Sequence, residues 1–397
     1  MNGRVNVLPG AQLLIDEPHR IPSGSRVGVL VNPTSILPDF RHLADCLIDR
    51  EDIKVTAIFG PEHGVFSTAQ DQIGVEAGTY RGIPVFSLYD GTRDGLAPDE
   101  ATVGELDILI FDIQDIGSRY YTYVWTMLEC MEVCAKKGVA MIVCDRPNPI
   151  GGLTIEGPML QEEFLSFVGR HPLCTRHGMT AGEIAMLCVK ERNIDVDLTV
   201  LRCRGWRRDL WIDRTSMVWF MPSPNMPTLE TATVYPGGCL IEGTNLSEGR
   251  GTTRPFEMIG APYVDGNVLA EALNKANLPG VFFRPVSFEP TFQKHAGRVC
   301  NGVFPFVIDR DDFRPVYTYL QLIATARALS PDEFDWRREP YEFEEDRLAI
   351  DLLFGTDQVR KAIEAGISPV EIAAGWRDDE SVFRARREPF LLYNGTS

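Results

Sequence analysis

Hydrophobic residues in the first 150 positions form short blocks that are separated by segments with helical spacing. Blocks without polar alternation predict buried strands at residues 27–31, 55–59, 84–88, 108–113 and 139–144. Helices are predicted at residues 40–50 and in the segment that Ser118 caps and Gly138 ends. Apolar strands that alternate with helices are typical of a parallel sheet with helices on both faces. We therefore expect an α/β fold in the amino-terminal part of the chain.

The pattern changes after about residue 160. Thr180 and Glu183 form a capping-box sequence that predicts a helix to about residue 191. Further along, strands are predicted near residues 281–288 and 303–308, and helices near residues 315–329 and 357–365. We expect two domains, a parallel-sheet domain over residues 1–160 and a smaller α+β domain over residues 161–397.

The predicted strands end in polar residues. In a parallel sheet, ligands bind at the carboxyl ends of the strands. The candidates that follow the strands are Asn32, Glu62, His63, Gln114, Asp115 and Arg146. This placement predicts a binding site along one edge of the sheet, with Asn32 and Gln114 as candidate substrate-binding residues.

Residues 59–64 have the sequence FGPEHG. The two glycines allow a sharp turn off the strand, and Pro61 stiffens it. Such a turn presents a carboxylate, Glu62, beside an imidazole, His63, and either group is a candidate general acid. The alternative is an ordinary strand-end turn with solvated polar residues.

Two further loops follow the fourth and fifth strands. Arg119, Tyr120 and Tyr121 lie at the start of a helix, where the tyrosine faces and hydroxyl groups suit a sugar ring. The alternative there is an aromatic core. After the fifth strand, two prolines stiffen a loop in which Arg146 is placed to bind a carboxylate. The alternative is an Asp145–Arg146 pair that holds the turn together.

The Pro- and Gly-rich region from residue 221 to residue 260 is dense in polar side chains. Its candidates for substrate binding are Asn225, Glu242, Asn245, Glu248, Arg250 and Arg254. Polar loops of this kind commonly line a binding site. Glycines close to arginines also suit a phosphate, but no lysine follows the glycines in Walker spacing.

The charge balance narrows the classes of ligand. The 397-residue chain has 39 basic and 56 acidic residues and a formal net charge of −17, which argues against nucleic-acid binding. An anionic substrate has to be held by a local arginine against this field. The remaining histidines are scattered and no zinc motif is present, so neither a metal nor another cofactor is expected.

The cysteines and the apolar runs of the chain help to predict where in the cell the protein is found. The nine cysteines form no C-x-x-C pair and several fall in predicted core elements, which favours reduced thiols. The first residues lack a signal-peptide pattern, and no apolar run is long enough to span a membrane. We expect a cytoplasmic protein that contacts neither a membrane nor nucleic acid.

These motifs resemble the exo-β-N-acetylmuramidase family of the NamZ type, formerly a domain of unknown function. The similar segments are FGPEHG at 59–64, DIQDIGSRYYTY at 112–123, DRPNP at 145–149, HGMTAGE at 177–183, PSPNMP at 222–227, EGTNLSEGRGTTRPFE at 242–257, FEPTFQKHAGRVCNGV at 288–303 and FLLYNG at 390–395. The resemblance implies a Rossmann-like amino-terminal domain without a dinucleotide, a smaller carboxy-terminal domain and an active-site cleft between them. It also implies that Glu62 is the catalytic glutamate.

The activity that the resemblance implies is exo-acting release of N-acetylmuramic acid from the non-reducing end of peptidoglycan fragments, with a small saccharide or muropeptide as partner. Glycosidases generally use two carboxyl groups about 5 to 9.5 Å apart. We expect Glu62 to be the acid and His63 to tune or position it. The second carboxyl group stays open among Asp115, Glu242 and Glu248, and the 2-acetamido oxygen of the sugar is an alternative nucleophile.

The lactyl carboxylate of muramic acid needs a cation in so acidic a chain. The candidates within the motifs are Arg119, Arg146, Arg250 and Arg254. From the residues alone, two other classes of protein remain open. One is a sugar-binding protein without turnover, and the other is an amidase or esterase that uses Ser223 or Ser247 as nucleophile.

Overall fold

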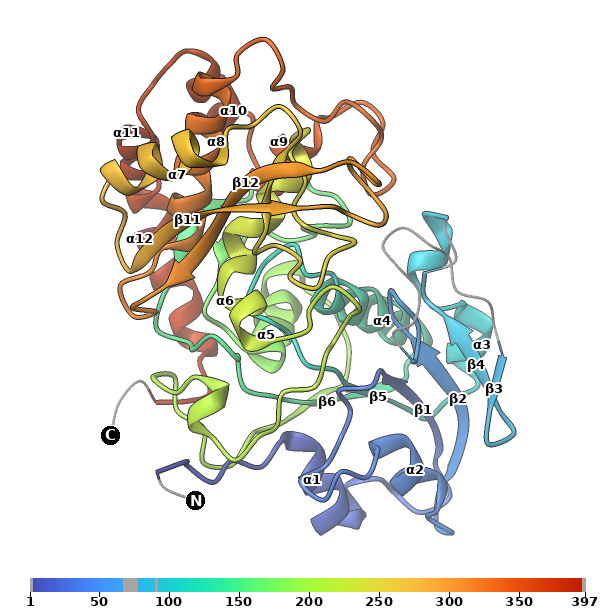
Figure 1. The fold of residues 1–397 in the computed structure, drawn as a ribbon. Coiled ribbons are helices and arrows are strands. Elements are labelled where there is room, and N and C mark those ends of the chain that lie inside the picture. Colours follow the sequence, from blue (N-terminus) through green and yellow to red (C-terminus); the bar gives the residue numbers. More distant parts are fainter. Residues whose placement is uncertain (1–2, 67–77, 90–91, 395–397) are drawn as a thin grey trace.

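The computed structural model describes residues 3–66, 78–89 and 92–394. Its largest feature is a seven-stranded sheet in the order β3-β4-β2-β1-β5-β6-β9 (Figure 1). The strands are β1 (Arg26–Val31), β2 (Lys54–Gly60), β3 (Gly78–Tyr80), β4 (Ile83–Ser87), β5 (Ile108–Asp112), β6 (Ala140–Cys144) and β9 (Leu198–Leu201). Neighbouring strands are parallel, except for β3 and β4. The predicted α/β fold is confirmed.

Helices cover both faces of this sheet, which explains its apolar strands. Strand β5 is buried at every position, and the central strand β1 is buried after its first residue. One face packs against α1 (Gly10–Asp16) and α2 (Leu43–Ile48). The other face packs against α3 (Glu100–Gly104), α4 (Tyr123–Lys137) and α5 (Ala181–Arg192). Burial of one aliphatic side chain contributes about 1.5–3 kcal/mol, so this pattern of strands favours a two-sided sheet.

The start of α4 differs from the prediction. Ser118 was expected to cap the helix, but the helix begins at Tyr123. The φ of 85° at Gly117 turns the backbone away from a helical path. Ser118 then pairs with Arg176 in an isolated bridge. The predicted end is confirmed, because Gly138 closes α4 with a φ of 67°.

The remaining chain forms a smaller unit around an antiparallel sheet. Its strands are β10 (Ile259–Ala261), β12 (Cys300–Val307) and β11 (Val281–Phe288), in that spatial order. Its helices are α6 (Leu229–Gly238), α7 (Gly266–Lys275), α8 (Pro315–Leu329), α9 (Ala349–Phe354), α10 (Gln358–Glu364), α11 (Pro369–Ala374) and α12 (Arg377–Arg387). A separate pair joins β7 (Glu156–Met159) to β8 (Cys174–Arg176). The strands predicted near residues 281–288 and 303–308 and the capping box of α5 are confirmed.

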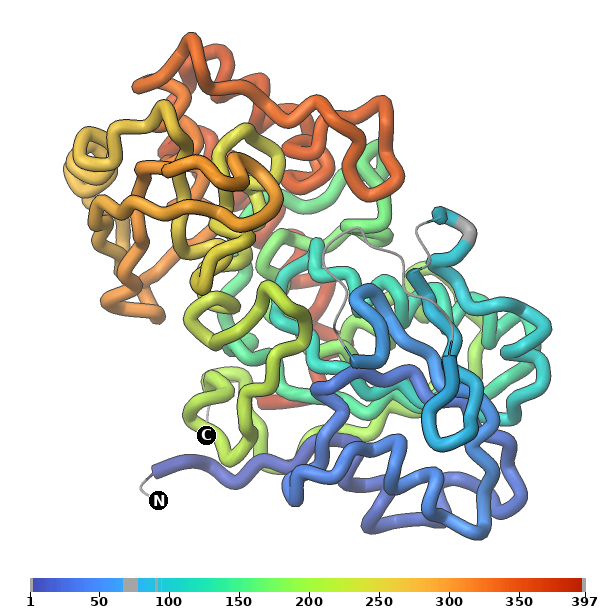
Figure 2. Tube along the Cα trace, turned by 45° about the vertical axis from the view of Figure 1, so that its right-hand side comes forward, coloured from blue at the N-terminus to red at the C-terminus, as the bar shows by residue number. Residues whose placement is uncertain are grey.

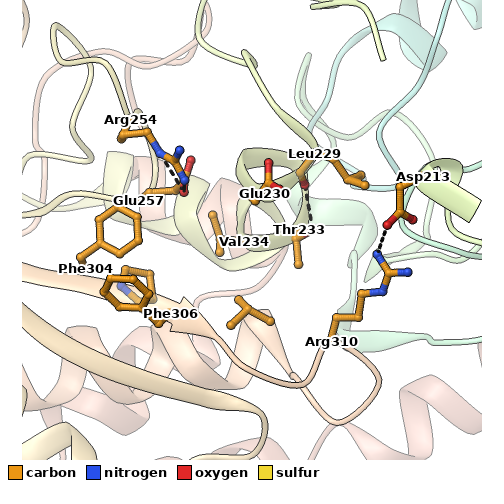
Figure 3. Close-up of a pocket in the computed structure, with 12 residues that line it drawn as sticks. Asp213, Leu229, Glu230, Thr233, Val234, Arg254, Glu257, Phe304, Phe306 and Arg310 are labelled. Carbon is orange, nitrogen blue, oxygen red and sulfur yellow. Dashed lines mark hydrogen bonds and ion pairs between the residues drawn. The ribbon is translucent and has the colours of Figure 1, made fainter. Parts of the chain in front are cut away.

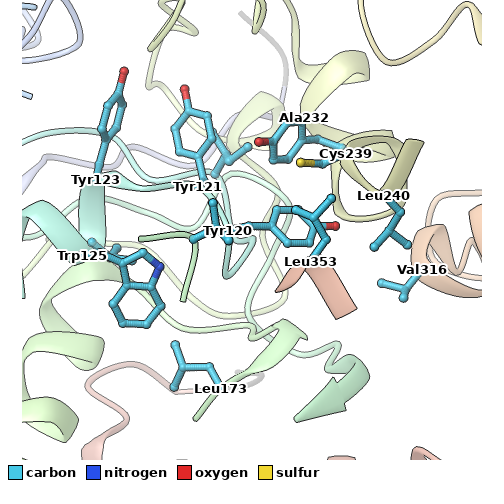
Figure 4. Close-up of a cluster of buried hydrophobic side chains, with 14 of the residues drawn as sticks. Tyr120, Tyr121, Tyr123, Trp125, Leu173, Ala232, Cys239, Leu240, Val316 and Leu353 are labelled. Carbon is cyan, nitrogen blue, oxygen red and sulfur yellow. The ribbon is translucent and has the colours of Figure 1, made fainter. Parts of the chain in front are cut away.

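The two units share one hydrophobic core, and the sheet continues past residue 160. The predicted domain limit at that position lies before α5 and β9, although β9 pairs with β6. Side chains from α4, α6, α8 and α9 pack in a single cluster (Figure 4). Figure 2 shows that the described chain also ends near its beginning. There Tyr393 donates a hydrogen bond of 2.6 Å to Asp145 at the end of β6.

Candidate active site

A pocket lies where the carboxyl end of β2 meets the segment before α4 and the smaller unit. It is lined by Glu62, His63, Tyr120, Tyr121, Thr122, Tyr123, Val168, Ser223, Asn225, Met226, Tyr235, Glu242, Arg250, Phe256, Tyr341 and Glu342. Both parts of the chain therefore contribute to it. Its volume is only about 40 Å³, so a sugar ring enters only when side chains of the wall move apart.

Glu62 and His63 lie in the turn directly after β2. Gly60 begins this turn and has no room for a side chain, because a Cβ atom there would lie 2.7 Å from the backbone nitrogen of Val65. His63 has a φ of 69°, and this left-handed conformation costs a non-glycine residue about 1 kcal/mol or more. The turn buries both side chains, which are 7% and 8% exposed. Backbone strain of this kind is typical of functional sites.

The two carboxyl oxygens of Glu62 have different neighbours. The hydroxyl group of Thr122 donates to Oε2 over 2.6 Å, and Nε2 of His63 lies 3.8 Å from Oε1. The bond from Thr122 fixes the carboxyl group against the start of α4. A carboxyl group held in this way at a pocket wall can transfer a proton to a bound group.

A second carboxylate, Glu242, comes from the short helix η5 (Cys239–Gly243). Arg250 donates to its Oε1 over 2.8 Å, and the hydroxyl group of Tyr341 donates to its Oε2 over 2.8 Å. Arg250 also lies 3.5 Å from Glu248. Both oxygens of Glu242 are thus held in place. A carboxylate fixed by charged and neutral donors can stabilise positive charge that develops in a substrate.

A third carboxyl group comes from a strained turn. The backbones of Tyr341 and Glu344 exchange two hydrogen bonds of 3.0 Å. The two residues between them, Glu342 and Phe343, have φ values of 47° and 67°. Turns of this type usually contain Asn-Gly, because both central positions are left-handed. Glu342 is 7% exposed and accepts a hydrogen bond of 3.1 Å from the Tyr89 hydroxyl group. The strain thus accompanies a buried carboxyl group at the pocket wall.

Tyrosine rings form much of the remaining wall. Tyr121 packs edge-to-face against Tyr123 at 4.9 Å and against Tyr235 at 5.7 Å between ring centres. Tyr235 in turn lies 4.7 Å from Phe256. Burial raises the pKa of Tyr121 and Tyr235 well above the usual value, so both hydroxyl groups are neutral. Flat rings with hydroxyl edges can bind both the faces and the hydroxyl groups of a sugar.

The structure brings some of the predicted site residues together and leaves others apart. Those that line the pocket are Glu62, His63, Tyr120, Tyr121, Asn225, Glu242 and Arg250. Those that do not line it are Asn32, Gln114, Asp115, Arg119, Arg146, Asn245, Glu248 and Arg254. Apart from Asn32, the second group lies in the same motifs as the first, but its side chains bind other parts of the protein.

Arg119 and Arg146 are buried away from the pocket. Arg119 donates to the carbonyl oxygen of Leu173 over 3.2 Å and also to that of Leu353. Arg146 forms an ion pair with Asp112 through contacts of 2.6 and 2.8 Å. A buried guanidinium group needs partners for its charge and its donors, and these partners are all internal. Neither arginine is placed to bind a lactyl carboxylate in the pocket.

Asn32 and Gln114 hold the loops beneath the pocket. The amide nitrogen of Asn32 donates to the carbonyl oxygen of Pro222 over 3.2 Å. The amide nitrogen of Gln114 donates to the carbonyl oxygens of Asp115 and Pro147 over 2.6 and 2.8 Å. Their polar atoms therefore stabilise backbone and do not line the cavity that they were predicted to line.

Asp115 lies beside His177, outside the pocket lining. Its Oδ2 accepts a hydrogen bond of 2.7 Å from Gly117 and lies 3.6 Å from Nε2 of His177. Burial raises the pKa of Asp115 to about 7. Burial, followed by nearby arginines, lowers the pKa of His177 to about 3. This position does not favour Asp115 as the second catalytic carboxyl group.

Asn245 and Glu248 stabilise the loop that carries Arg250. The side-chain nitrogen of Asn245 donates to the carbonyl oxygen of Glu333 over 2.7 Å. Lys294 binds Oε2 of Glu248 over 3.0 Å. Both residues thus stabilise the loop through these contacts, and neither lines the pocket.

Arg254 lines a different and wider groove, between α6 and β12 (Figure 3). There it pairs with Glu257, and its guanidinium carbon lies 5.5 Å from the ring centre of Phe304. At the other end of the same groove, Arg310 pairs with Asp213 over 2.9 Å. The predicted role of Arg254 in substrate binding is therefore not supported by its place relative to Glu62.

The sequence analysis missed several residues of the pocket. Thr122 lies inside the tyrosine motif, and Ser223 was considered only as a nucleophile, so attention to motif hydroxyl groups would have found both. Tyr341 and Glu342 lie in an acidic stretch with no motif and no glycine, the residue that usually marks such a turn. No local signal pointed to these two residues.

Within residues 3–66, 78–89 and 92–394, no group of three or more His, Cys, Asp or Glu side chains is arranged to hold a metal ion. Over the same ranges, every helix is too short or too polar to cross a membrane.

Comparison with known proteins identifies the family. Models described as the N-terminal and C-terminal parts of the exo-β-N-acetylmuramidase NamZ match residues 27–230 and 233–393. The peptidoglycan β-N-acetylmuramidase NamZ of Bacillus subtilis (strain 168) is 43% identical over 389 residues, which cover 98% of this chain and 91% of that protein. Two crystal structures of DUF1343 family proteins from Bacteroides fragilis NCTC 9343 are 30% identical, with TM-scores of 0.89 and 0.73, and the matches cover 98% of this chain and 100% of each of those chains. The chain belongs to the NamZ family of exo-β-N-acetylmuramidases, glycoside hydrolases that act on peptidoglycan.

Proposed function

We propose that the pocket around Glu62 is where this enzyme releases N-acetylmuramic acid from the non-reducing end of peptidoglycan fragments. The observation that carries the proposal is the buried carboxyl group of Glu62, which Thr122 fixes beside His63. The same pocket holds Glu242 and Glu342 and a wall of tyrosines. A glycosidase needs this combination of an acid, a second polar group and a sugar-binding surface.

In the proposed reaction, Glu62 is the general acid. Its proton moves to the glycosidic oxygen while the bond from that oxygen to C1 of muramic acid breaks. A water molecule then supplies a hydroxyl group to C1, and its remaining proton restores the acid. His63 positions the Glu62 carboxyl group through their 3.8 Å contact.

We assign the second carboxyl role to Glu242. Of the three candidates that the sequence left open, Glu242 lines the pocket, whereas Asp115 and Glu248 do not. Arg250 and Tyr341 hold its two oxygens, so its position is set before the substrate binds. In this role Glu242 stabilises the positive charge that develops on the sugar ring.

Arg250 is the proposed partner of the lactyl carboxylate. Of the four arginines that the motifs offered, it is the one that lines the pocket. Its guanidinium carbon lies 5.1 Å from the ring centre of Phe256, another residue of the pocket wall. A bidentate contact between arginine and a carboxylate is among the strongest that a binding site offers.

The test compares muramic acid and glucosamine glycosides that carry the same leaving group. Wild type should prefer the muramic acid glycoside by at least about a hundredfold in kcat/KM, which is near 3 kcal/mol. Arg250→Ala should slow both reactions, because Arg250 also holds Glu242. It should slow the muramic acid reaction more and so narrow this ratio. Arg254→Ala is the matched control and should leave the ratio unchanged. A wild type that prefers the glucosamine glycoside would refute the assignment of muramic acid as the substrate. An unchanged ratio in Arg250→Ala would exclude Arg250 as the partner of the lactyl carboxylate.

The family assignment sets aside the two rival classes, a binding protein without turnover and a serine amidase or esterase. The proposal also includes a cytoplasmic place of action on small saccharides or muropeptides. It is supported by the nine cysteines, which are all free thiols and of which only Cys46 is not buried.

A further inference from the structure

A larger cavity adjoins the catalytic pocket across the turn at residues 341–344. Its volume is about 430 Å³, within the range of roughly 300–1,000 Å³ that is usual for ligand sites. Glu342 lines both cavities, while the consecutive residues Phe167 and Val168 line the larger cavity and the catalytic pocket respectively. The two cavities therefore share a wall at this turn and at residues 167–168.

Three arginines, Arg93, Arg170 and Arg192, line this space, which we call the arginine-lined cavity. Such a cluster is notable in a chain with a net charge of −17. The side chains of Arg170 and Arg192 are 23% and 31% exposed. Burial lowers the pKa of Arg170 to about 10, and the charges of Arg192 and Arg93 add to the effect. The three positive charges therefore act on the same space.

Three acidic side chains, Glu129, Glu342 and Glu344, also line the cavity, and Glu342 accepts a hydrogen bond from Tyr89. Glu129, Glu344 and the nearby Glu132 are paired with arginines, two of which belong to the cavity itself. These pairs are Arg192 with Glu132 at 2.6 Å, Arg347 with Glu344 at 2.6 Å, and Arg170 with Glu129. Arg93 differs, because its guanidinium group lies 3.7 Å from Glu344 and its side chain is 71% exposed. Exposed ion pairs of this length contribute little free energy. An incoming carboxylate can therefore bind Arg93 without breaking a strong contact.

Aromatic rings provide a surface beside these charges. The ring centres of Phe167 and Phe343 lie 6.0 Å apart, and each lies 5.7 Å from the ring centre of Tyr89. The hydroxyl group of Tyr89 binds Glu342, so this cluster is tied directly to the catalytic pocket. Aromatic rings next to guanidinium and carboxyl groups suit a sugar that carries an acid.

The chemistry of peptidoglycan supplies a ligand with this character. N-acetylmuramic acid alternates with N-acetylglucosamine along the strand, so the next carboxylate lies beyond one intervening glucosamine. We propose that the arginine-lined cavity is a second glycan site, in which Arg93 binds the carboxylate of the next muramic acid along the strand. This inference rests on the function proposed above, because it takes the terminal muramic acid to lie at Glu62.

The experiment measures the initial release of N-acetylmuramic acid from three substrates. They are the disaccharide, the tetrasaccharide with two repeats, and the same tetrasaccharide with its internal lactyl carboxyl group as the methyl ester. Wild type should cleave the acid tetrasaccharide with a kcat/KM about tenfold above that of the disaccharide, which corresponds to about 1.4 kcal/mol. The ester should lose most of this advantage, because it carries no charge for Arg93.

Variants then test the residue itself. Arg93→Ala should reduce the preference for the acid tetrasaccharide and leave the disaccharide rate unchanged, and Arg93→Lys should keep part of the preference. Arg284→Ala is a matched control, because Arg284 is exposed on β11 and lines neither cavity. Since Arg93 is largely exposed, its replacement leaves the core intact.

The outcomes separate this inference from the proposed function. Equal kcat/KM values for all three substrates in wild type would overturn the second site and leave the activity standing. An equal loss on disaccharide and tetrasaccharide in Arg93→Ala would also overturn it, because that residue would then act at the catalytic pocket. No release of muramic acid from the disaccharide would refute the function itself.

Discussion

The catalytic pocket and the polar layer beneath it come from the same motifs but have different surroundings. In the pocket, Glu62 and Glu242 are held by hydroxyl and guanidinium groups at the wall of a cavity. In the layer, Arg119 and Arg146 are equally buried, but their donors are directed to carbonyl oxygens and to Asp112. Charged residues of the same motifs are thus buried to a similar degree in the two regions.

The difference between the two regions shows that the binding partners of a buried charge distinguish a catalytic residue from a structural one. A buried charge costs several kcal/mol unless it is paired, so both regions must satisfy their polar groups. In the layer, the partners are carbonyl oxygens of distant segments and the carboxylate of Asp112, and the result is a rigid base. In the pocket, the partners are side chains, and each of the two carboxyl groups also lines a cavity. Substitutions in the pocket and in the layer test whether the first changes activity and the second changes stability.

The largest effect is expected from Glu62→Gln. The substitution removes the proton that the proposed acid donates, and general acid catalysis contributes roughly 100- to 10,000-fold. We expect kcat to fall by this factor on the natural disaccharide and by less on a substrate with a good leaving group. Thermal unfolding should be nearly unchanged, because an amide still accepts the Thr122 hydrogen bond. Equal rates for variant and wild type on the disaccharide would place Glu62 in the supporting layer.

Arg146→Ala should have the opposite profile. It leaves Asp112 as a buried unpaired charge, which costs about 3–5 kcal/mol. We expect a lower urea midpoint, with kcat of the folded fraction largely retained. Arg26→Ala is the control, because it breaks a similar pair with Asp107 whose side chains are 48% and 44% exposed, and such exposed pairs contribute about 1 kcal/mol or less. Equal losses of unfolding free energy in the two variants would show that burial does not increase the contribution of the Arg146–Asp112 pair to stability.

A smaller effect is expected from Asp115→Asn, and it depends on pH. The pKa of Asp115 rises from 3.8 to about 7 on folding. Between these values the unfolded chain releases the proton and the folded protein keeps it, so this group makes the protein less stable as pH rises. The variant lacks this penalty, so it should gain stability relative to wild type from pH 4 to 7, by about 1 kcal/mol or more, with no further gain above pH 7.

Unfolding free energies of wild type and Asp115→Asn at pH 4, 5.5 and 7 check this. His177, whose lowered pKa acts in the opposite direction, is present in both proteins, so both stability curves include its titration. A difference that stays constant across these pH values would mean that Asp115 is ionised in the folded protein.

The smallest effect is expected from EDTA. The proposed chemistry uses the pocket's own carboxyl and imidazole groups, and the described residues include no cluster arranged to bind a metal. Incubation with EDTA should leave the rate unchanged. A rate that disappears with the chelator and returns with a divalent ion would show that the pocket needs more than its side chains.

Local sequence patterns predicted the main strands and the capping box of α5, because these depend on residues close in the chain. They failed for β9, a strand of only four residues, which is too short to show a clear pattern. They also failed at Ser118, since the path there is set by contacts with β8 rather than by the preference of one residue. Short elements that depend on distant partners lack a local signal.

The sequence by itself determined that a parallel sheet ends in polar loops and that Glu62 and His63 follow its second strand. The tertiary structure decided which polar residues face a cavity. Arg119 meets a carbonyl group at Leu353, 234 positions away, and Glu342 reaches the pocket through a turn with no sequence signature. The free energy of a buried charge depends on all the atoms around it, and most of those atoms belong to segments that only folding brings near.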